Sequence, residues 1–150
     1  MATRLLGYFM NFKSVTMELK DSRAFSVNQA TGRDARFKST AYKQWYTILK
    51  QQIIAHPEYA NLLILAEDFL ADETQAIELD YHVQYPADFF KNSKGLVSSK
   101  TYDVSNTEKL FIDMLVGDIM GINDKYVRKL VSSKGPGDNY SLKFTIRLIK

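Results

Sequence analysis

The chain has 150 residues, of which 45% are hydrophobic and 25% charged, proportions typical of one globular domain rather than of a disordered or fibrous protein. Because the chain has no cysteine, disulfides, thiolate zinc sites and iron–sulfur clusters are excluded. The longest apolar run, Leu5 to Met10, is too short for a membrane span or a secretory signal. We therefore expect a cytoplasmic protein with a single domain over residues 1–150, in which residues 1–13 form an N-terminal extension.

The charged residues are unevenly distributed along the chain. Residues 1–50 contain nine Lys or Arg and three Asp or Glu, residues 51–88 contain eight acids and no Lys or Arg, and residues 89–150 contain eleven basic and six acidic residues. Two basic segments around an acidic one are typical of a fold with one face that attracts phosphates. Charge alone is equally consistent with an ordinary solvated surface.

The first half of the chain predicts a strand, a helix and a second strand. Val15, Met17 and Leu19 alternate with polar residues over 14–20, which indicates a half-buried strand. A polar and basic loop follows over residues 25–39. Apolar residues at helical spacing, Trp45 among them, predict a helix from Thr40 that ends before Pro57. Strict alternation over residues 75–86 predicts the second strand.

The second half predicts a loop over residues 92–100, a helix from near Asp103 to residues 117–121, and two strands over 126–133 and 140–149. Ser105 and Glu108 have the spacing of a capping box, in which the hydroxyl and the carboxylate each satisfy an amide of the first helical turn. The order of these elements predicts an α/β fold, with a small mixed sheet of four to five strands and two main helices packed on it.

Common enzyme motifs are mostly missing. The sequence has no glycine-rich phosphate loop, no dinucleotide-binding fingerprint and no nucleophile elbow. His56 and His82 are the two histidines, and ordinary surface or capping roles are the favoured interpretation of both.

Carboxylates and a lysine gather around the predicted second helix. Asp103 precedes it, Lys109 and Asp113 share one of its faces with Asn106, and Asp124 lies in the break before the next strand. Carboxylates brought together repel one another unless a cation lies between them, and Mg²⁺ prefers such oxygen ligands. The alternative is structural: Lys109 and Asp113 would form a solvated i,i+4 pair, and Asp103 and Asp124 would be helix-start and turn residues.

The residues from Tyr102 to Leu115, followed by Gly121 to Val127 and ending in Lys134, resemble the RusA family of crossover-junction endodeoxyribonucleases. The family pattern is Asp-x-Asp-Asn, a lysine three residues later, Asp-x-Leu after another turn, and Asp-Asp at the start of the next strand. Upstream, Ser26-Val27-Asn28 with Arg36-Phe37 and Tyr42 is similar to the family's opening loop and first helix.

This resemblance implies a small α/β domain that works as a homodimer and resolves four-way DNA junctions with Mg²⁺, for which Mn²⁺ is a possible substitute. It implies no nucleotide cofactor and no membrane, and such proteins are often encoded by phages or prophages in a bacterial host. Asp103 matches the first essential aspartate, Lys109 the essential lysine and Asp124 the aspartate at the strand start. Asn106 and Asp113 match further positions of the pattern whose role is less direct.

Two positions depart from the pattern. Ser105 stands where the family has its second aspartate, and Asn123 where it has the first of the Asp-Asp pair. A serine hydroxyl is a neutral and weaker ligand, so Glu108 or Asp113 would have to supply the missing oxygen. The alternatives to a full resolvase are a branched-DNA binder that has lost its chemistry and a related nuclease that acts on flaps.

DNA contacts are expected from basic side chains and one amide outside the acidic cluster. A backbone held in this way would be recognised by its shape rather than by its base sequence. Taken singly, each of these residues is as well explained by an ordinary solvated side chain. The candidates are Asn28, Arg33, Arg36, Lys38, Lys43, Lys94, Lys100 and Lys134.

Overall fold

The computed structural model describes residues 13–20, 40–98 and 104–150. In chain order its elements are β1 (Ser14–Lys20), α2 (Thr40–Ala55), α3 (Tyr59–Ala71), β2 (Ala76–Pro86), α4 (Ala87–Phe90), α5 (Val104–Ile112), the π-helix η2 (Asp113–Ile119), the 3-10 helix η3 (Asp124–Tyr126), β3 (Val127–Gly137) and β4 (Ser141–Ile149). The expected α/β class is confirmed.

The four strands form one mixed sheet in the order β1-β4-β2-β3. β4 is antiparallel to both of its neighbours, whereas β2 and β3 are parallel. A parallel pair needs a crossover connection, and α4, α5, η2 and η3 provide it between β2 and β3. This crossover is the part of the fold that carries the motif described above.

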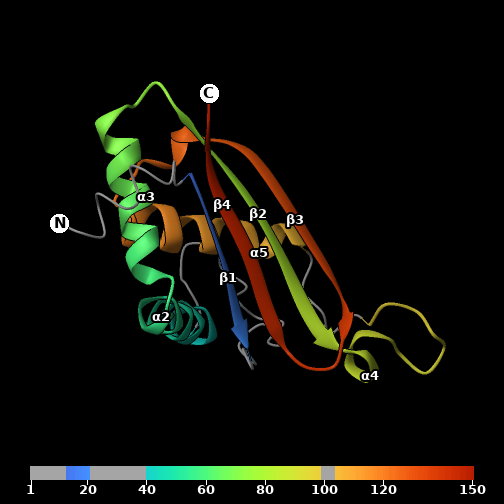
Figure 1. The fold of residues 1–150 in the computed structure, drawn as a ribbon. Helices are drawn as coiled ribbons and strands as arrows, with labels where there is room; N and C mark the ends of the chain where they lie inside the picture. The colour runs from blue at the N-terminus through green and yellow to red at the C-terminus, as the bar shows by residue number, and fades with distance from the viewer. Residues whose placement is uncertain (1–12, 21–39, 99–103) are drawn as a thin grey trace.

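One face of the sheet is buried by helices. Met17, Phe144 and Tyr81 pair across β1, β4 and β2 and are each about 1% exposed, and the same alternation runs the length of these strands. In Figure 1, α5 crosses behind the sheet, while α2 and α3 cover the side of β1. The core that results contains the single tryptophan, Trp45, which is 2% exposed as expected.

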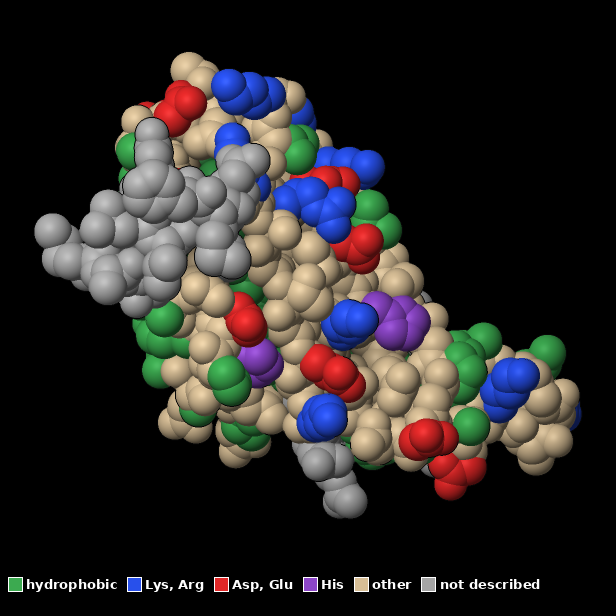
Figure 2. Space-filling model, in the orientation of Figure 1, with side chains coloured by type: hydrophobic (Ala, Val, Ile, Leu, Met, Phe, Trp, Pro, Cys, Tyr) green, Lys and Arg blue, Asp and Glu red, His purple; other side chains and the backbone are tan. Residues whose placement is uncertain are grey.

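The other face of the sheet is open and polar, and it is the face seen in Figure 2, where acidic and basic side chains are interspersed. Glu78 accepts from Lys129 on β3 at 3.0 Å and from Arg147 on β4 at 3.2 Å. The hydrogen bond from Lys129, helped by the charge of both cations, lowers the pKa of Glu78. Because charges of both signs are paired there, this face is not a continuous basic surface.

Four features differ from the expectations. The helix α3 over Tyr59–Ala71 was not predicted, because its apolar residues form a nearly continuous run, with five of them buried, and show no helical period. α4 is a further short helix, and β3 extends to Gly137, four residues beyond the predicted end of that strand at residue 133. The expected helix to residues 117–121 is present, but from Asp113 it continues as a π-helix that ends before Gly121, whose φ is +69°.

Candidate functional site

Helix α5 is held by aromatic packing on one of its sides. Phe111 lies 4.9 Å from Tyr81 and 5.3 Å from Phe144, measured between ring centroids, and Leu110 beside it is 1% exposed. These contacts fix the rotation of the helix about its axis. The neighbouring positions Lys109 and Asp113 therefore lie away from the core, as the sequence pattern predicted.

Lys109 and Asp113 form an ion pair. Their Nζ and Oδ2 atoms are 3.3 Å apart, and the side chains are 82% and 32% exposed. An exposed i,i+4 pair of this kind contributes only about 0.3–0.5 kcal/mol to stability. The two residues thus form the solvated i,i+4 pair that was the structural alternative. Because the pair is weak, Lys109 could leave Asp113 and bind another anion such as a phosphate.

Glu108 connects α5 to the sheet. Its Oε1 accepts a hydrogen bond of 2.8 Å from the hydroxyl of Ser132 on β3. Since α5 begins at Val104, Ser105 falls inside the first turn and not at the capping position, so the expected capping box was wrong.

Lys134 follows Ser132 by two residues on β3, which places it on the same side of the strand, and it is half-buried.

Asp124 lies at the other end of the crossover. It is exposed in the first position of η3, where the Asn123 side chain accepts from the amide of Lys125 at 2.9 Å. Ser132, the contact of Glu108, comes five residues after Val127, the first residue of β3. At about 3.3 Å per strand residue, this puts roughly 16 Å between Ser132 and the start of β3.

The acidic side chains that the structure describes do not form a metal-binding group by themselves. In the part of the chain that the structure describes, no group of three or more His, Cys, Asp or Glu is close enough to hold a metal ion. Glu108 and Asp113 lie on α5 and η2, and Asp124 lies on η3, beyond the end of β3 that is remote from the Glu108–Ser132 contact. Asp103 lies outside the described residues.

Most of the expected DNA contacts also lie outside the described residues: Asn28, Arg33, Arg36, Lys38 and Lys100. Lys43 is exposed on α2, where with Gln44, Thr47 and Ile48 it lines a shallow depression of about 430 Å³. Lys94 is exposed in the loop after α4. The basic residues that can be placed are therefore spread over three elements rather than gathered in one patch.

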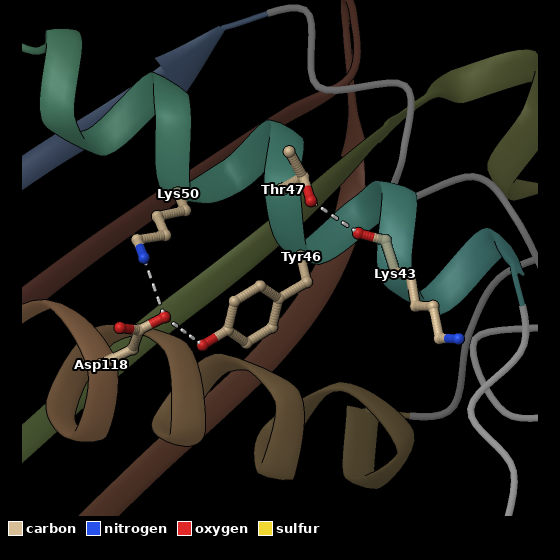
Figure 3. A network of polar contacts seen from close by, with 5 residues as sticks. All are labelled: Lys43, Tyr46, Thr47, Lys50 and Asp118. Atoms are coloured by element: carbon tan, nitrogen blue, oxygen red, sulfur yellow. Dashed lines mark hydrogen bonds and ion pairs between the residues drawn. The ribbon is translucent and has the colours of Figure 1, made fainter.

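A polar contact that the sequence did not indicate ties α2 to η2. Asp118 accepts from the hydroxyl of Tyr46 at 2.6 Å and from Nζ of Lys50 at 2.9 Å, and Figure 3 shows the Lys43 side chain pointing away from them. The hydrogen bond from Tyr46, followed by that from Lys50, lowers the pKa of Asp118. The sequence carries no signal for this contact, because the π-helix changes which residues face α2.

No family model matches the chain, and no curated protein matches it either. Among solved structures, 2C-methyl-D-erythritol 2,4-cyclodiphosphate synthase from Plasmodium vivax is similar over 70% of this chain and 67% of that one, at 12% identity and a TM-score of 0.30. A similarity this weak carries no argument about function. None of the described helices is long and apolar enough to cross a bilayer.

Proposed function

We propose that this chain is a Mg²⁺-dependent endodeoxyribonuclease that resolves four-way DNA junctions as a homodimer in the cytoplasm of a bacterial host, and that it is of phage or prophage origin. The observation that carries the proposal is the placement of the motif on the β2–β3 crossover. α5 begins directly after position 103, Lys109 is exposed on it, and Asp124 opens the turn before β3. This order of elements is the one that the RusA resemblance implies.

The chemistry proposed is hydrolysis of one phosphodiester bond in each of two strands. A water oxygen forms a bond to phosphorus, one bridging P–O bond breaks, and the proton lost by the water is balanced by the one gained at the leaving oxygen. Lys109 would bind a nonbridging oxygen, where its ammonium offsets the negative charge that develops as the water attacks. Lys134, on the strand that contacts Glu108, would hold the neighbouring backbone.

The metal would be held by Asp103 and Asp124, with Glu108 and Asp113 as the candidates for the oxygen that Ser105 does not supply. A bound Mg²⁺ neutralises phosphate charge and makes water more acidic. The described members do not by themselves form such a site, because Glu108 is bonded to Ser132 and Asp113 to Lys109. Since Asp124 and the Glu108–Ser132 contact lie at separate parts of the crossover in one chain, a site that uses both would take Asp124 from the partner subunit or need the crossover to rearrange on DNA.

The second candidate function is a branched-DNA binder without chemistry, and the observation that favours it is Ser105 in place of an acid. A synthetic four-way junction incubated in Mg²⁺ and analysed on a denaturing gel separates the two, with binding followed in parallel by gel shift in Ca²⁺. The nuclease predicts paired cuts near the branch point. Binding to the junction without any cut would support the second candidate instead.

Ser105→Asp sharpens this comparison. Adding a carboxylate strengthens the hold on a divalent cation, so we expect faster cutting and a lower Mg²⁺ concentration for half-maximal rate. Ser133→Asp is a matched control, because Ser133 is exposed on the open face of the sheet, where it contacts His82. If Ser105→Asp cuts no faster than the natural chain, another group already supplies the oxygen.

A further inference from the structure

The loop that follows α4 projects beyond the end of the sheet. In Figure 1 it extends past the tips of β2 and β3, and in Figure 2 it forms a lobe that carries basic and apolar side chains. Residues 91–97 of this loop are all exposed. Projections of this shape make little contribution to a core, so their side chains are available to a partner.

Two adjacent aliphatic side chains lie in this loop. Leu96 is 62% exposed and Val97 is 53% exposed, and they are the two most exposed large apolar side chains in the described part of the chain. Single exposed apolar residues are common and need no explanation. A neighbouring pair on a projecting loop is different, because it concentrates apolar area at one point of the surface.

The loop is held in shape by its own hydrogen bonds. The Asn92 side chain accepts from the amides of Lys94 at 2.9 Å and Leu96 at 3.1 Å, and the Asn92 amide donates to the Leu96 carbonyl at 2.8 Å. Gly95, with φ +76°, permits the turn between them, and Lys91 pairs with Val97 as an antiparallel bridge. A loop ordered before binding loses little conformational entropy when it binds.

Aromatic side chains fix the base of the loop to the sheet. Phe90 is 7% exposed, and its carbonyl accepts from the amide of Ser98 at 2.7 Å, which closes the loop. Phe89 is stacked on Tyr85 at 5.7 Å and lies edge-on to Tyr140, also at 5.7 Å. The tip with Leu96 and Val97 is therefore mounted rigidly on β2 and the start of β4.

The charge around the apolar tip is positive. The sequence from Phe89 to Tyr102 contains Lys91, Lys94 and Lys100 and no acid, and Asp88 and Asp103 bound this segment. Aliphatic side chains flanked by lysines are suited to DNA: the lysines can bind the phosphates of the two backbones, and the aliphatic side chains can insert between the apolar faces of stacked base pairs. An anionic membrane is a poorer match, because two aliphatic side chains bury little area in lipid.

We propose that this loop is a wedge that inserts Leu96 and Val97 between base pairs at the branch point of a DNA junction, with Lys91 and Lys94 on the flanking phosphates. The inference rests on the proposed function. Val97 precedes the start of α5 by seven residues, so the chain between them spans at most about 25 Å. Lys109 lies five residues further along α5, about 8 Å at about 1.5 Å per residue, so the wedge and Lys109 lie within about one turn of B-DNA, about 34 Å, and can act on one junction.

The test uses a four-way junction with 2-aminopurine beside the branch point, whose fluorescence rises when the base is unstacked. In Ca²⁺, the natural chain should raise the signal on binding. The double variant L96S/V97S should lose most of this rise and bind the junction about tenfold more weakly, while binding to linear duplex stays unchanged. Lys91→Gln with Lys94→Gln should instead weaken binding to both DNAs and reduce the salt dependence.

Leu70→Ser is the matched control, because Leu70 is 52% exposed on α3, far along the chain from the loop. It should leave the fluorescence rise and the affinity unchanged, and thermal melts should show that every variant is folded. If the natural chain binds the junction without any rise, or L96S/V97S keeps the full rise, the wedge is wrong while junction binding stands.

Two further outcomes concern the partner. If the natural chain binds a junction no better than duplex, the proposed function fails and the wedge fails with it. Flotation with phosphatidylserine vesicles tests whether the loop binds an anionic membrane instead of DNA. Loss of vesicle binding in L96S/V97S, with the fluorescence rise on the junction retained, would reassign the loop to lipid and overturn the wedge.

Discussion

Lys109 is the described residue on which the proposed chemistry depends most directly. Its ammonium is largely exposed, and its described partner, Asp113, is held by a weak surface pair. We expect Lys109→Gln to lower the rate of junction cutting about 100-fold or more, because a charged donor to the phosphoryl oxygens is removed. Junction affinity and the thermal midpoint should hardly change. Single-turnover cutting in Mg²⁺, gel shift in Ca²⁺ and thermal melting measure the three quantities.

Lys143→Gln is the control for this variant. Lys143 is exposed on β4, on the open face of the sheet, which faces away from α5. It removes the same charge and should leave the cutting rate unchanged. Equal losses in the two variants would show that Lys109 contributes only general attraction to DNA, and its assignment as a catalytic residue would be abandoned.

At the scale of elements, the contact between α2 and η2 matters because η2 is a π-helix. A π-helix has poorer backbone geometry than an α-helix and persists where the surrounding structure holds it. Met114, Leu115 and Val116 are buried on one side of η2, and Asp118 is bound by Tyr46 and Lys50 of α2 on another. The contact therefore helps to fix the helix on which Asp113 lies.

Asp118→Ala tests this contact. We expect it to lower the free energy of unfolding by about 1 kcal/mol at neutral pH, equivalent to about 2–4 °C in the thermal midpoint of a chain of this size. Because the pKa of Asp118 is lower in the folded protein, its stabilisation is complete above the ordinary aspartate pKa and disappears as the pH falls through the folded value. The two chains should therefore converge in stability below about pH 4.

Asp80→Ala is the matched control, since Asp80 is an exposed carboxylate on the open face of β2. Melting curves of both variants between pH 3 and 7 separate a specific contact from a general change of charge. A difference between the natural chain and Asp118→Ala that persists unchanged at pH 3 would mean that the ionised carboxylate is not what stabilises η2.

Elements with a clear period were predictable from the sequence. β1 was expected over 14–20 and spans Ser14–Lys20, because Val15, Met17 and Leu19 alternate with residues on the open face. α3 was missed for the opposite reason: its apolar residues form a nearly continuous run, of which Leu62, Ile64 and Leu65 are buried, so no polar stripe reveals the period. The π-helix was also out of reach, since apolar spacing does not distinguish it from a continuing α-helix.

At the scale of the whole molecule, the sequence predicted which residues flank the crossover but not how far apart they lie. Lys109 and Asp113 share a face because helical spacing alone decides it. The distance from Glu108 to Asp124 depends on where α5 crosses β3, and the Glu108–Ser132 bond sets that crossing near the middle of the strand. No local pattern in the sequence encodes such a contact.

This separation leads to a prediction about the dimer. If a metal site uses Asp103 of one subunit and Asp124 of the partner subunit, Asp103→Asn and Asp124→Asn should each abolish cutting while sparing junction binding. A dimer with one subunit of each variant then contains one site with both carboxylates and one with neither. Co-expression of the two variants should therefore restore nicking of one strand, at about a quarter of the natural rate when subunits assort at random.

If the two variants carry different affinity tags, purification in two steps isolates the mixed dimer. The measured rate then no longer depends on how the subunits assort. The same protocol with two Asp103→Asn subunits is the control and should stay inactive. A mixed dimer without activity would mean that each chain builds its own site, and the crossover would then have to rearrange on DNA to bring its two ends together. Full activity in Asp124→Asn alone would remove Asp124 from the site and leave α5, with Lys109, as the centre of the chemistry.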